Sequence, residues 1–490
     1  MTASVYTKPQ PELRNLFDQA GDPRKVLCAP IDYAKRKHTV LFCNGVGDIL
    51  KKAFAVDNSP TGLTDLLAHL NATCRHHHLQ PTNAFFGGED IPAWAENFIT
   101  ALRAKGFAVA RVNAWEAKKQ RENFQASSDT LDLLGIAQCL LKHRGKFNPP
   151  VADDYRHLRD LCRERHCFVT SATALTNRLH NYVDRLFPQF LDPKKSGIPP
   201  FTPACWWLLQ ERFSAPQIAR RRTTSLIKGL QRRGLADAST AAATLQALAR
   251  EVLPPCPQYV ATWQQLLEVL AQEGQCLQQT IAGLDHRIAP LLAKTPGAVL
   301  TSIAGIGVTL AAGMAGELGP PDQLPNLDLL CSYAGIVPAT KQSGGPDQAP
   351  VVLGVRHRSN HHLKNYLVQA ANKVGQLGPP ELQHRYHEVQ ARNSHADFVV
   401  AKDLLGLAKS LMQRQTLYLP PDLYAPESSA SARASYFLEL WPKLLIKWQS
   451  KAPLAQVFAA ETPLGKWREM AQQSYSISLP LPQRSQSAKA

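Results

Sequence analysis

The sequence predicts an α/β domain followed by a longer, mainly helical region. Between residues 26 and 141, short β-branched or apolar runs alternate with segments of helical spacing, which is typical of helices that cover a sheet. From residue 155 onward, the apolar residues recur mainly with a helical period. The 490 residues correspond to about two to four domains. A hydrophobic content of 44% is enough for buried cores and excludes global disorder.

The first domain is expected over residues 26–150, after a polar, proline-containing arm at residues 1–25. Its strand-like and helix-like segments can be read from the pattern of apolar residues. The predicted strands are residues 26–31, 38–43, 83–86 and 107–112, and the predicted helices are residues 63–70, 93–105 and 125–142.

A coiled-coil region with a basic insert is expected over residues 151–296. Residues 155–190 read as one long helix that ends near Pro188, and residues 258–292 as a second one. The second keeps the 3–4 spacing of a coiled-coil seam, with Gly274 as its one gap. Either the two helices fold against each other within one chain, or the seam pairs with a second chain. The adjacent Trp206 and Trp207 either anchor a hydrophobic corner or stack on RNA bases.

The last parts are a mainly helical domain over residues 297–420 and an extension over residues 421–490. A Gly/Pro-rich loop at residues 335–354 interrupts the helical domain. The extension offers one possible helix at residues 437–448.

The charge distribution points to a polyanionic partner. The formal charge is +16, and residues 156–233 alone hold 15 Lys and Arg against 5 Asp and Glu. This concentration favours a nucleic-acid track, with Arg220, Arg221 and Arg222 facing phosphates, over a merely solvated helix face. No apolar run approaches the length of a membrane span or a signal peptide. Ten scattered cysteines without CxxC pairs suit a reducing cytosol.

Four carboxylates of the first domain are candidates for a metal site. Asp32 and Glu89 each follow an apolar strand, and Asp129 and Asp132 share one face of a helix. Clustered carboxylates repel one another unless a cation is present, and hard oxygen ligands favour Mg²⁺. A pair of such ions about 4 Å apart suits in-line displacement at phosphorus. The alternative is a helix cap at Asp129 and a turn residue at Asp32.

A glycine turn near residue 305 is a second candidate site. Gly305 and Gly307 stand between two apolar helical segments, as in a helix–hairpin–helix turn. Backbone N–H groups and the following helix N-terminus can hold a DNA phosphate there without reading bases. The alternative is a tight helix–helix connection.

The third candidate is the Ser343-Gly-Gly loop. A phosphate could approach the hydroxyl of Ser343 on this uncrowded loop, although a serine needs a base, a metal or nearby cations to act as a nucleophile. Lys341, Arg356, His357 and Arg358 are near in sequence and could stabilise a phosphorane. The alternative is that Ser-Gly-Gly is only a flexible turn.

Together these segments resemble the RNA-guided transposases of the IS110 and IS1111 group, from about residue 26 to residue 420. The similar blocks occur in the family's order. They are IDYAKRKH, GGED, VNAWEAKKQRENFQASSDTLDLLGIA, LRDLCRERHCFVTSATALTNRLHNYVDRLFP and LTSIAGIGVTLAAGMAGELG…SYAGIVPATKQSGG…RHRSNHHLKNYLVQAA.

The resemblance implies a RuvC-like (RNase H-type) first domain and a C-terminal transposase domain. Asp32, Glu89, Asp129 and Asp132 match the family's Mg²⁺-binding set, and Ser343 matches its serine nucleophile. A phosphoserine–DNA intermediate would form where the two domains meet, between subunits of a dimer or tetramer. A structured non-coding RNA would pair with donor and target DNA. We therefore expect a cytoplasmic, nucleoid-associated prokaryotic protein.

The sequence departs from the family pattern in a few places. The two glycines precede Glu89 here instead of following it, so Asp90 or Glu96 could be the third ligand. Asn113-Ala114 replaces Asn-Pro, and Ser359 stands where an Arg-Gly-Asn run has Gly. Residues 421–490 match nothing in the family. Two other functions stay open: a RuvC-like nuclease that uses water, and a non-catalytic nucleic-acid scaffold.

Overall fold

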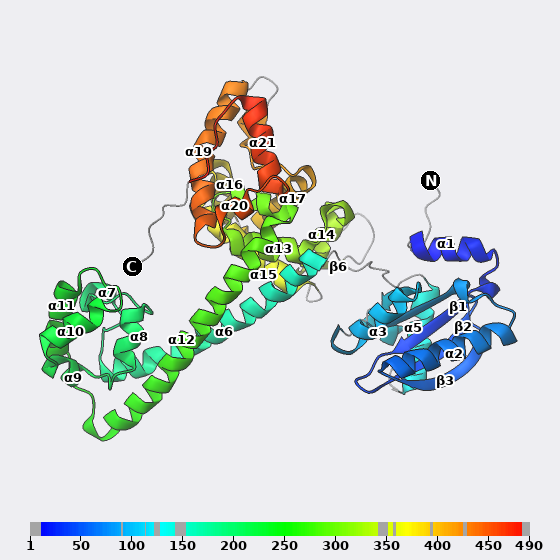
Figure 1. Cartoon of the computed structure of the whole chain (residues 1–490), viewed down its shortest axis with the longest axis horizontal. Coiled ribbons are helices and arrows are strands. Elements are labelled where there is room, and N and C mark those ends of the chain that lie inside the picture. Colours follow the sequence, from blue (N-terminus) through cyan, green and yellow to red (C-terminus); the bar gives the residue numbers. More distant parts are fainter. Residues whose placement is uncertain are drawn as a thin grey trace. The chain divides into compact units, whose positions relative to one another are not determined.

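The computed structural model describes residues 11–89, 92–112, 114–121, 128–142, 153–341, 351–355, 359–392, 395–424 and 429–482. The chain divides into two compact units, an N-terminal unit over Met1–Pro150 and a C-terminal unit over Val151–Ala490 (Figure 1). Each unit has its own buried apolar clusters. No helix in the described ranges has the length and apolar character needed to span a membrane.

A mixed five-stranded sheet forms the centre of the N-terminal unit. Its strands are β1 (Leu27–Asp32), β2 (Lys37–Asn44), β3 (Ile49–Asp57), β4 (Ala84–Glu89) and β5 (Ala108–Val112). The strand order is β3-β2-β1-β4-β5, with β1 antiparallel to β2 and parallel to β4. The four predicted strands are confirmed. The edge strand β3 was not predicted, and Val56 is its one buried residue.

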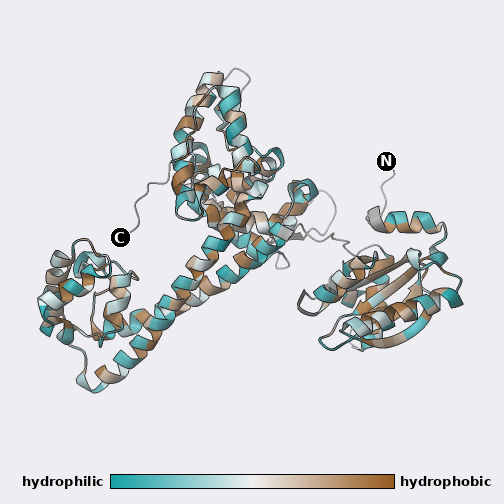
Figure 2. Cartoon of the chain, viewed as in Figure 1, coloured by the Kyte–Doolittle hydropathy of each residue, from teal (hydrophilic) through white to brown (hydrophobic). Residues whose placement is uncertain are grey.

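Helices cover both faces of this sheet. One face packs against α2 (Pro60–His76) and α3 (Pro92–Ala104), and the other against α1 (Pro11–Ala20), α4 (Ala114–Lys119) and α5 (Asp129–Leu141). Leu27, Ala29 and Ile31 of β1 enter the first core, whereas Cys28 enters the second. The strands are therefore apolar on both faces, as their brown colour in Figure 2 shows.

Residues 11–25 are ordered, in contrast to the loose arm expected over residues 1–25. Leu13 and Leu16 of α1 are buried, and the ring of Phe17 lies 6.3 Å from that of Phe85 on β4. Three apolar residues at 3–4 spacing are enough to dock this short helix on the sheet. They are too few to outweigh the polar composition of the segment in a prediction from sequence. A 3₁₀ turn, Pro23–Lys25, leads into β1.

Two long helices dominate the centre of the C-terminal unit. α6 (Asp153–Leu186) and α12 (Pro257–Ala293) run side by side in opposite directions (Figure 1). Asp285 of α12 joins them, since its carboxylate accepts a hydrogen bond of 2.5 Å from Arg165 and one of 2.9 Å from Lys451. The two helices are confirmed, and they pack against each other within the chain. Supercoiling and pairing with a second chain stay predictions.

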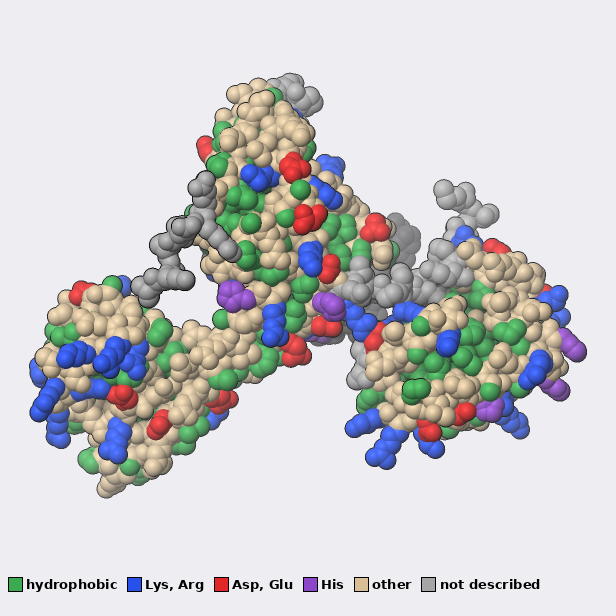
Figure 3. Space-filling view, viewed as in Figure 1, with side chains coloured by type: hydrophobic (Ala, Val, Ile, Leu, Met, Phe, Trp, Pro, Cys, Tyr) green, Lys and Arg blue, Asp and Glu red, His purple; other side chains and the backbone are tan. Residues whose placement is uncertain are grey.

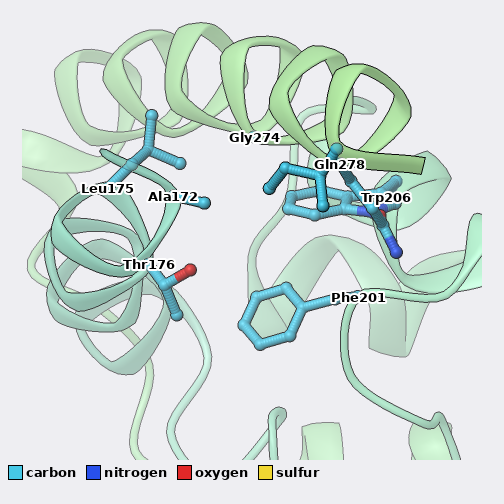
Figure 4. Close-up of a pocket in the computed structure, with 8 residues that line it drawn as sticks. Ala172, Leu175, Thr176, Phe201, Trp206, Gly274 and Gln278 are labelled. Carbon is cyan, nitrogen blue, oxygen red and sulfur yellow. The ribbon is translucent and has the colours of Figure 1, made fainter. Parts of the chain in front are cut away.

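Gly274, the gap in the predicted seam of α12, is the position where the insert docks. A Cβ atom there would lie 2.8 Å from the ring of Trp206. The Trp206 indole donates a hydrogen bond of 2.6 Å to Gln278 on the same helix. Figure 4 shows Trp206 beside Gly274 at a cavity of about 180 Å³, with Leu175 of α6 on the opposite side. The hydrophobic-corner interpretation therefore describes Trp206, because it joins the insert to the long helices.

The insert itself is a small helical module between α6 and α12. Its helices are α7 (Pro193–Ser196), α8 (Pro203–Leu209), α9 (Ala215–Arg220), α10 (Thr223–Gln231) and α11 (Ala238–Glu251). Their apolar residues form one core that also includes Leu179 of α6 and Leu267 of α12.

The remaining elements form a helical bundle with one small antiparallel sheet. They are η3 (Pro296–Ser302), α13 (Val308–Leu318), η4 (Pro321–Gln323), α14 (Leu327–Ala334), β6 (Pro338–Lys341), β7 (Val351–Val355), α15 (His361–Leu377), α16 (Pro380–Arg392), α17 (Ala396–Arg414), α18 (Pro421–Tyr424), α19 (Ala430–Gln449), α20 (Leu454–Val457) and α21 (Pro463–Tyr475). The expected loop at residues 335–354 thus contains two paired strands, β6 and β7. Alternation over four or five residues beside glycines and prolines is too short to predict them.

The extension over residues 421–490 contributes to the core of this bundle. Its predicted helix is confirmed as α19, whose Trp441 and Trp448 are buried with the apolar residues of η3 and α13. Lys447 of α19 donates hydrogen bonds of 2.6, 2.8 and 2.9 Å to the carbonyl oxygens of Thr301, Ile303 and Ile306. Burial lowers the pKa of Lys447 to about 8. One side chain thus satisfies three acceptors of the glycine turn.

Replacing Lys447 by Met should destabilise the C-terminal unit by about 3 kcal/mol, because three carbonyl groups lose their donor and stay enclosed. Urea unfolding followed by tryptophan fluorescence measures the difference. Lys443→Met is the matched control, since Lys443 is exposed on the same helix. Equal midpoints for the two variants would show that the contacts of Lys447 do not stabilise the fold.

Candidate active site

Two of the four candidate carboxylates lie at one edge of the five-stranded sheet. Asp32 is the last residue of β1, and Glu89 is the last residue of β4. The strands are parallel, and their register pairs Ile31 with Gly88. Asp32 and Glu89 therefore follow directly on a pair of neighbouring residues, and their side chains emerge at the same edge.

The glycine pair before Glu89 has a packing role. A Cβ atom on Gly88 would lie 2.4 Å from the ring of Tyr33, and one on Gly87 would lie 2.5 Å from Leu140 of α5. Only glycine lets α5 and the segment after β1 approach β4 this closely. The two glycines that depart from the family order thus let the segment after β1 and α5, the helix that carries Asp129 and Asp132, pack closely against β4.

Asp129 and Asp132 are in the first turn of α5. Ser128 is the N-cap of this helix, and its hydroxyl accepts a hydrogen bond of 3.3 Å from the N–H of Leu131. Because Ser128 caps α5, Asp129 is free of the capping role considered as its alternative. Asp129 is exposed and Asp132 is half-buried. α5 packs against β1 and β4.

The charges of these carboxylates act on one another. Burial, followed by the charges of Asp132 and Asp129, raises the pKa of Asp32 above its usual range. Burial, followed by the charges of Asp32 and Asp132, likewise raises the pKa of Glu89. The guanidinium of Arg121, which forms an ion pair with Asp132, opposes both shifts. The sequence analysis did not single out Arg121, because nothing in its local pattern distinguishes it from a surface arginine.

The two alternatives to Glu89 are placed differently. Glu96 of α3 forms an ion pair of 2.6 Å with Arg111 of β5, and both side chains are largely buried. Its carboxylate is therefore engaged in a structural pair, whereas Glu89 feels the charges of Asp32 and Asp132. Asp90 lies outside the described residues. The arrangement favours Glu89 over Glu96 as the third member of the set.

The four acids fit a hard divalent cation by their chemistry. They supply only carboxylate oxygens. The pKa values of Asp32 and Glu89 are raised by burial and then by repulsion between the carboxylates, and a cation would relieve this repulsion. In the described residues, no group of three or more His, Cys, Asp or Glu side chains is already gathered as closely as metal ligands are. The side chains would therefore have to draw together around an ion, and Asp132 would exchange its contact with Arg121.

This electrostatic pattern predicts a pH-dependent effect of Mg²⁺ on stability. Because the folded-state pKa values of Asp32 and Glu89 are raised, their contribution is largest in acid and is lost as the pH rises through those values. An ion that binds the charged carboxylates opposes this loss. We expect Mg²⁺ to raise the melting temperature of the N-terminal unit at about pH 7.5 and to change it little at about pH 5.

Thermal denaturation of the full chain with and without Mg²⁺ at both pH values tests this expectation. The double variant Asp32→Asn/Glu89→Gln is the control, and it should show no increase with Mg²⁺. An equal increase at both pH values, or in the control, would contradict binding at these carboxylates.

The glycine turn lies in the C-terminal unit, between η3 and α13. Gly305 has a φ of +86°, and Gly307 is the N-cap residue of α13. The helical segment expected before the turn is a 3₁₀ helix, η3. The carbonyls of this turn face Lys447, and Gly307 has open space beside it. Phosphate binding at Gly305 and Gly307 stays a prediction.

The serine loop itself is not covered by the structure. Ser343, Arg356, His357 and Arg358 lie outside the described residues, and Lys341 ends β6. The residues that bracket the loop are described. The N–H of Asn360 donates a hydrogen bond of 2.7 Å to the carbonyl of Tyr333, so the two ends of the segment that contains Ser343 are tied together.

Tyr333 and Asn360 also belong to a network of hydrogen bonds and ion pairs around the buried carboxylate of Glu317. Glu317 of α13 accepts hydrogen bonds of 2.6 and 2.8 Å from Arg163 of α6 and one of 2.7 Å from the amide of Asn360. The same amide nitrogen donates to the hydroxyl of Tyr333 at 2.7 Å. The sequence analysis missed this network. The available signal was Glu317 itself, a lone acid in the apolar run AAGMAGELG that requires a buried partner.

The three consecutive arginines of the insert occupy different environments. Arg220 and Arg222 are exposed, whereas Arg221 is half-buried beside Trp207.

The comparisons with known proteins connect both units to one family. A DEDD transposase model of the IS110 type matches residues 29–188, and a model of the transposase IS116/IS110/IS902 family matches residues 297–387. The chain belongs to the IS110 family of transposases. It is thus an enzyme that acts on DNA, and DEDD transposase domains typically use divalent metal ions. No curated protein matches the chain.

The family matches cover the candidate sites and leave two regions aside. Asp32, Glu89, Asp129 and Asp132 all fall in the first match, and Gly305, Gly307 and Ser343 fall in the second. The basic insert and α12 lie between the two matches, and α17 to α21 follow the second.

Proposed function

We propose that this IS110-family transposase is a Mg²⁺-dependent DNA recombinase that forms a phosphoserine intermediate through Ser343. The observation that carries the proposal is that Asp32 and Glu89 end neighbouring parallel strands and both feel the charge of Asp132 on α5, in a segment that matches the DEDD transposase model. Repulsion between neighbouring carboxylates opposes folding. Their proximity is therefore better explained by a role in phosphoryl transfer than by a role in stability.

We infer a RuvC-like (RNase H-type) fold for the N-terminal unit. The support is its mixed sheet, in which three antiparallel strands are followed by two parallel ones, with helices on both faces. The candidate acids come from the ends of β1 and β4 and from the first turn of α5. Such a sheet edge is a rigid support for a reaction site.

The chemistry follows from the residues. Asp32, Glu89, Asp129 and Asp132 would hold Mg²⁺, which supplies neutralisation of the phosphate charge when bound. Ser343 Oγ attacks phosphorus, so that one P–O bond forms as another breaks. The departing strand leaves as a hydroxyl and takes the proton that the serine gives up. A hydroxyl of a second strand reverses the step, and strand exchange therefore needs no outside energy.

The partners are donor and target DNA, with a structured non-coding RNA as guide and further copies of this chain as subunits. Gly305, Gly307, Lys341, Arg356 and Arg358 would contact the DNA backbone near the reacting strand. Arg220, Arg221 and Arg222 would contact nucleic acid at the insert. Base pairing with the guide would choose the sequence, while these backbone contacts position it.

A denaturing gel tests the proposal. Protein purified with its co-expressed element RNA is incubated with labelled junction DNA and Mg²⁺, and wild type is compared with Ser343→Ala. A labelled protein–DNA adduct in wild type alone supports serine catalysis. Free cleaved DNA from both proteins, with no adduct, would instead indicate a nuclease that uses water. Absence of cleavage with every metal ion tried would leave the scaffold function.

A further inference from the structure

The insert module, residues 187–256, carries a basic surface to which neither family match assigns a role. It contains ten Lys and Arg against four Asp and Glu. Figure 3 shows Lys and Arg side chains gathered on this module. The exposed ones among them are Lys194, Lys195, Arg212, Arg220, Arg222, Lys228, Arg232 and Arg250. An excess of this kind attracts a polyanion, but charge alone does not make a binding site.

Trp207 organises two further arginines of this surface. The guanidinium carbons of Arg221 and Arg233 lie 4.7 and 4.6 Å from the centre of its ring. The Trp207 indole donates a hydrogen bond to Glu211, whose carboxylate forms an ion pair of 2.6 Å with Arg221. The ring itself is largely buried in the core of the module. Both guanidiniums are therefore held against a rigid support by cation–π contacts.

The backbone that carries Arg221 is held as well. Gln246 of α11 is buried, and its amide nitrogen donates to the carbonyls of Arg221 at 2.7 Å and Ile218 at 3.3 Å. The amide oxygen of Gln246 accepts a hydrogen bond of 2.9 Å from Thr223. A buried glutamine that spans the turn between α9 and α10 fixes the position of the arginine loop. Little side-chain or backbone entropy remains to be lost when Arg221 binds a ligand.

The pair of guanidiniums has more donor capacity than its protein contacts use. A guanidinium has five N–H donors in a planar fork, and this fork matches phosphate oxygens. Glu211 is the acid that forms an ion pair with Arg221, and Arg233 donates a long hydrogen bond of 3.4 Å to the carbonyl of Gly229. One carboxylate thus balances two fixed positive charges. The excess positive charge lies on two positioned side chains rather than on flexible ones.

We propose that the insert module is a clamp for the phosphodiester backbone of a nucleic-acid duplex. Arg221 and Arg233 bind the phosphates, Trp207 and Gln246 position them, and the exposed Lys and Arg around them attract the duplex. The proposal rests on the proposed function for the class of its partner, since a DNA transposase works on nucleic acid. It does not need Ser343 or the carboxylates. DNA and RNA duplexes share the chemistry that the clamp recognises.

Fluorescence anisotropy with the full chain tests the clamp. The probes are labelled DNA and RNA duplexes of one sequence and about 20 base pairs, roughly two helical turns. Arg221→Gln/Arg233→Gln is compared with Arg414→Gln/Lys443→Gln, which removes two exposed charges elsewhere in the unit. We expect the clamp variant to bind about tenfold more weakly. Between about 50 and 300 mM KCl, the slope of log K against the logarithm of the salt concentration should become shallower by about 2, as expected for the loss of two phosphate contacts.

The two probes identify the source of the phosphates. A loss on both duplexes supports a clamp that reads the backbone alone, and a loss on one duplex assigns the clamp to that nucleic acid. An unchanged affinity and salt dependence on both, or an equal loss in the control variant, would overturn the proposal. Thermal denaturation of each variant shows whether the module is still folded.

A charge-preserving variant separates a positioned clamp from a merely basic surface. Arg221→Lys/Arg233→Lys keeps both charges but loses the planar forks that stack on Trp207. We expect it to lose several-fold in affinity while its thermal stability changes little, and full wild-type affinity would overturn the positioning by Trp207. Ser343→Ala and Asp32→Asn should keep wild-type binding. Failure of the proposed chemistry and failure of the clamp are thus seen in different variants.

Discussion

Asp32→Asn is expected to lower DNA strand cleavage about a thousandfold, which corresponds to about 4 kcal/mol of transition-state stabilisation. The replacement has nearly the same shape, so β1 and its register with β4 stay intact. It removes one negative ligand from a cluster in which Asp32, Glu89 and Asp132 act on one another. It also removes a repulsion, so the variant without metal should be at least as stable as wild type.

Cleavage of labelled junction DNA measures the rate, and the melting temperature with and without Mg²⁺ measures metal binding independently of activity. Asp65→Asn is the matched control, because Asp65 is an exposed acid on α2 of the same unit. We expect the control to cleave like wild type and to keep its response to Mg²⁺. Wild-type cleavage by Asp32→Asn, with an unchanged response to Mg²⁺, would remove Asp32 from the proposed site.

Glu317→Ala should destabilise the C-terminal unit by about 3 kcal/mol. This is the lower end of the cost of removing one partner of a buried ion pair, because the Arg163 side chain is 39% exposed and can be hydrated in the variant. Arg163 would lose two hydrogen bonds, and Asn360 would lose one. Asn360 closes the segment that contains Ser343, so we also expect the protein–DNA adduct to decrease. Urea unfolding gives the stability, and Glu268→Ala, an exposed acid on α12, is the control. Equal stability of the two variants would contradict a structural role of Glu317.

The same network predicts a sensitivity to acid. Burial alone would raise the pKa of Glu317, but its hydrogen bonds with Arg163 and Asn360 lower it below its usual value. A carboxyl with a lowered folded-state pKa stabilises the fold at neutral pH, and this contribution is lost as the pH falls through that value. The difference in stability between wild type and Glu317→Ala should therefore narrow in acid.

Local patterns were sufficient to predict the elements that have many buried apolar residues or a long helical repeat of them. β1, β2, β4 and β5 are runs of buried residues, and α6 and α12 repeat their apolar residues over many turns. Two elements with only a few buried residues, α1 and the edge strand β3, were not predicted. Their stability comes from the surface on which they dock, and that surface is made by distant parts of the chain.

The candidate site also has a part that could be predicted from the sequence and a part that could not. Asp32, Glu89, Asp129 and Asp132 could be proposed from strand ends and helix spacing, because carboxylates in those positions share an edge in any such sheet. Their partners could not be predicted. Arg121 approaches Asp132 because α4 and α5 pack together, and no short motif encodes that contact.

The sequence by itself determined the class of the two units, the order of their main elements and the acids at the sheet edge, since apolar periodicity and strand-end positions are local properties. The tertiary structure decided which charges meet. Arg163 and Glu317 are 154 residues apart, and Lys447 is more than 140 residues from the carbonyls it binds. Burying a charge is favourable only when a partner is within hydrogen-bond distance, and packing between remote segments alone provides that partner.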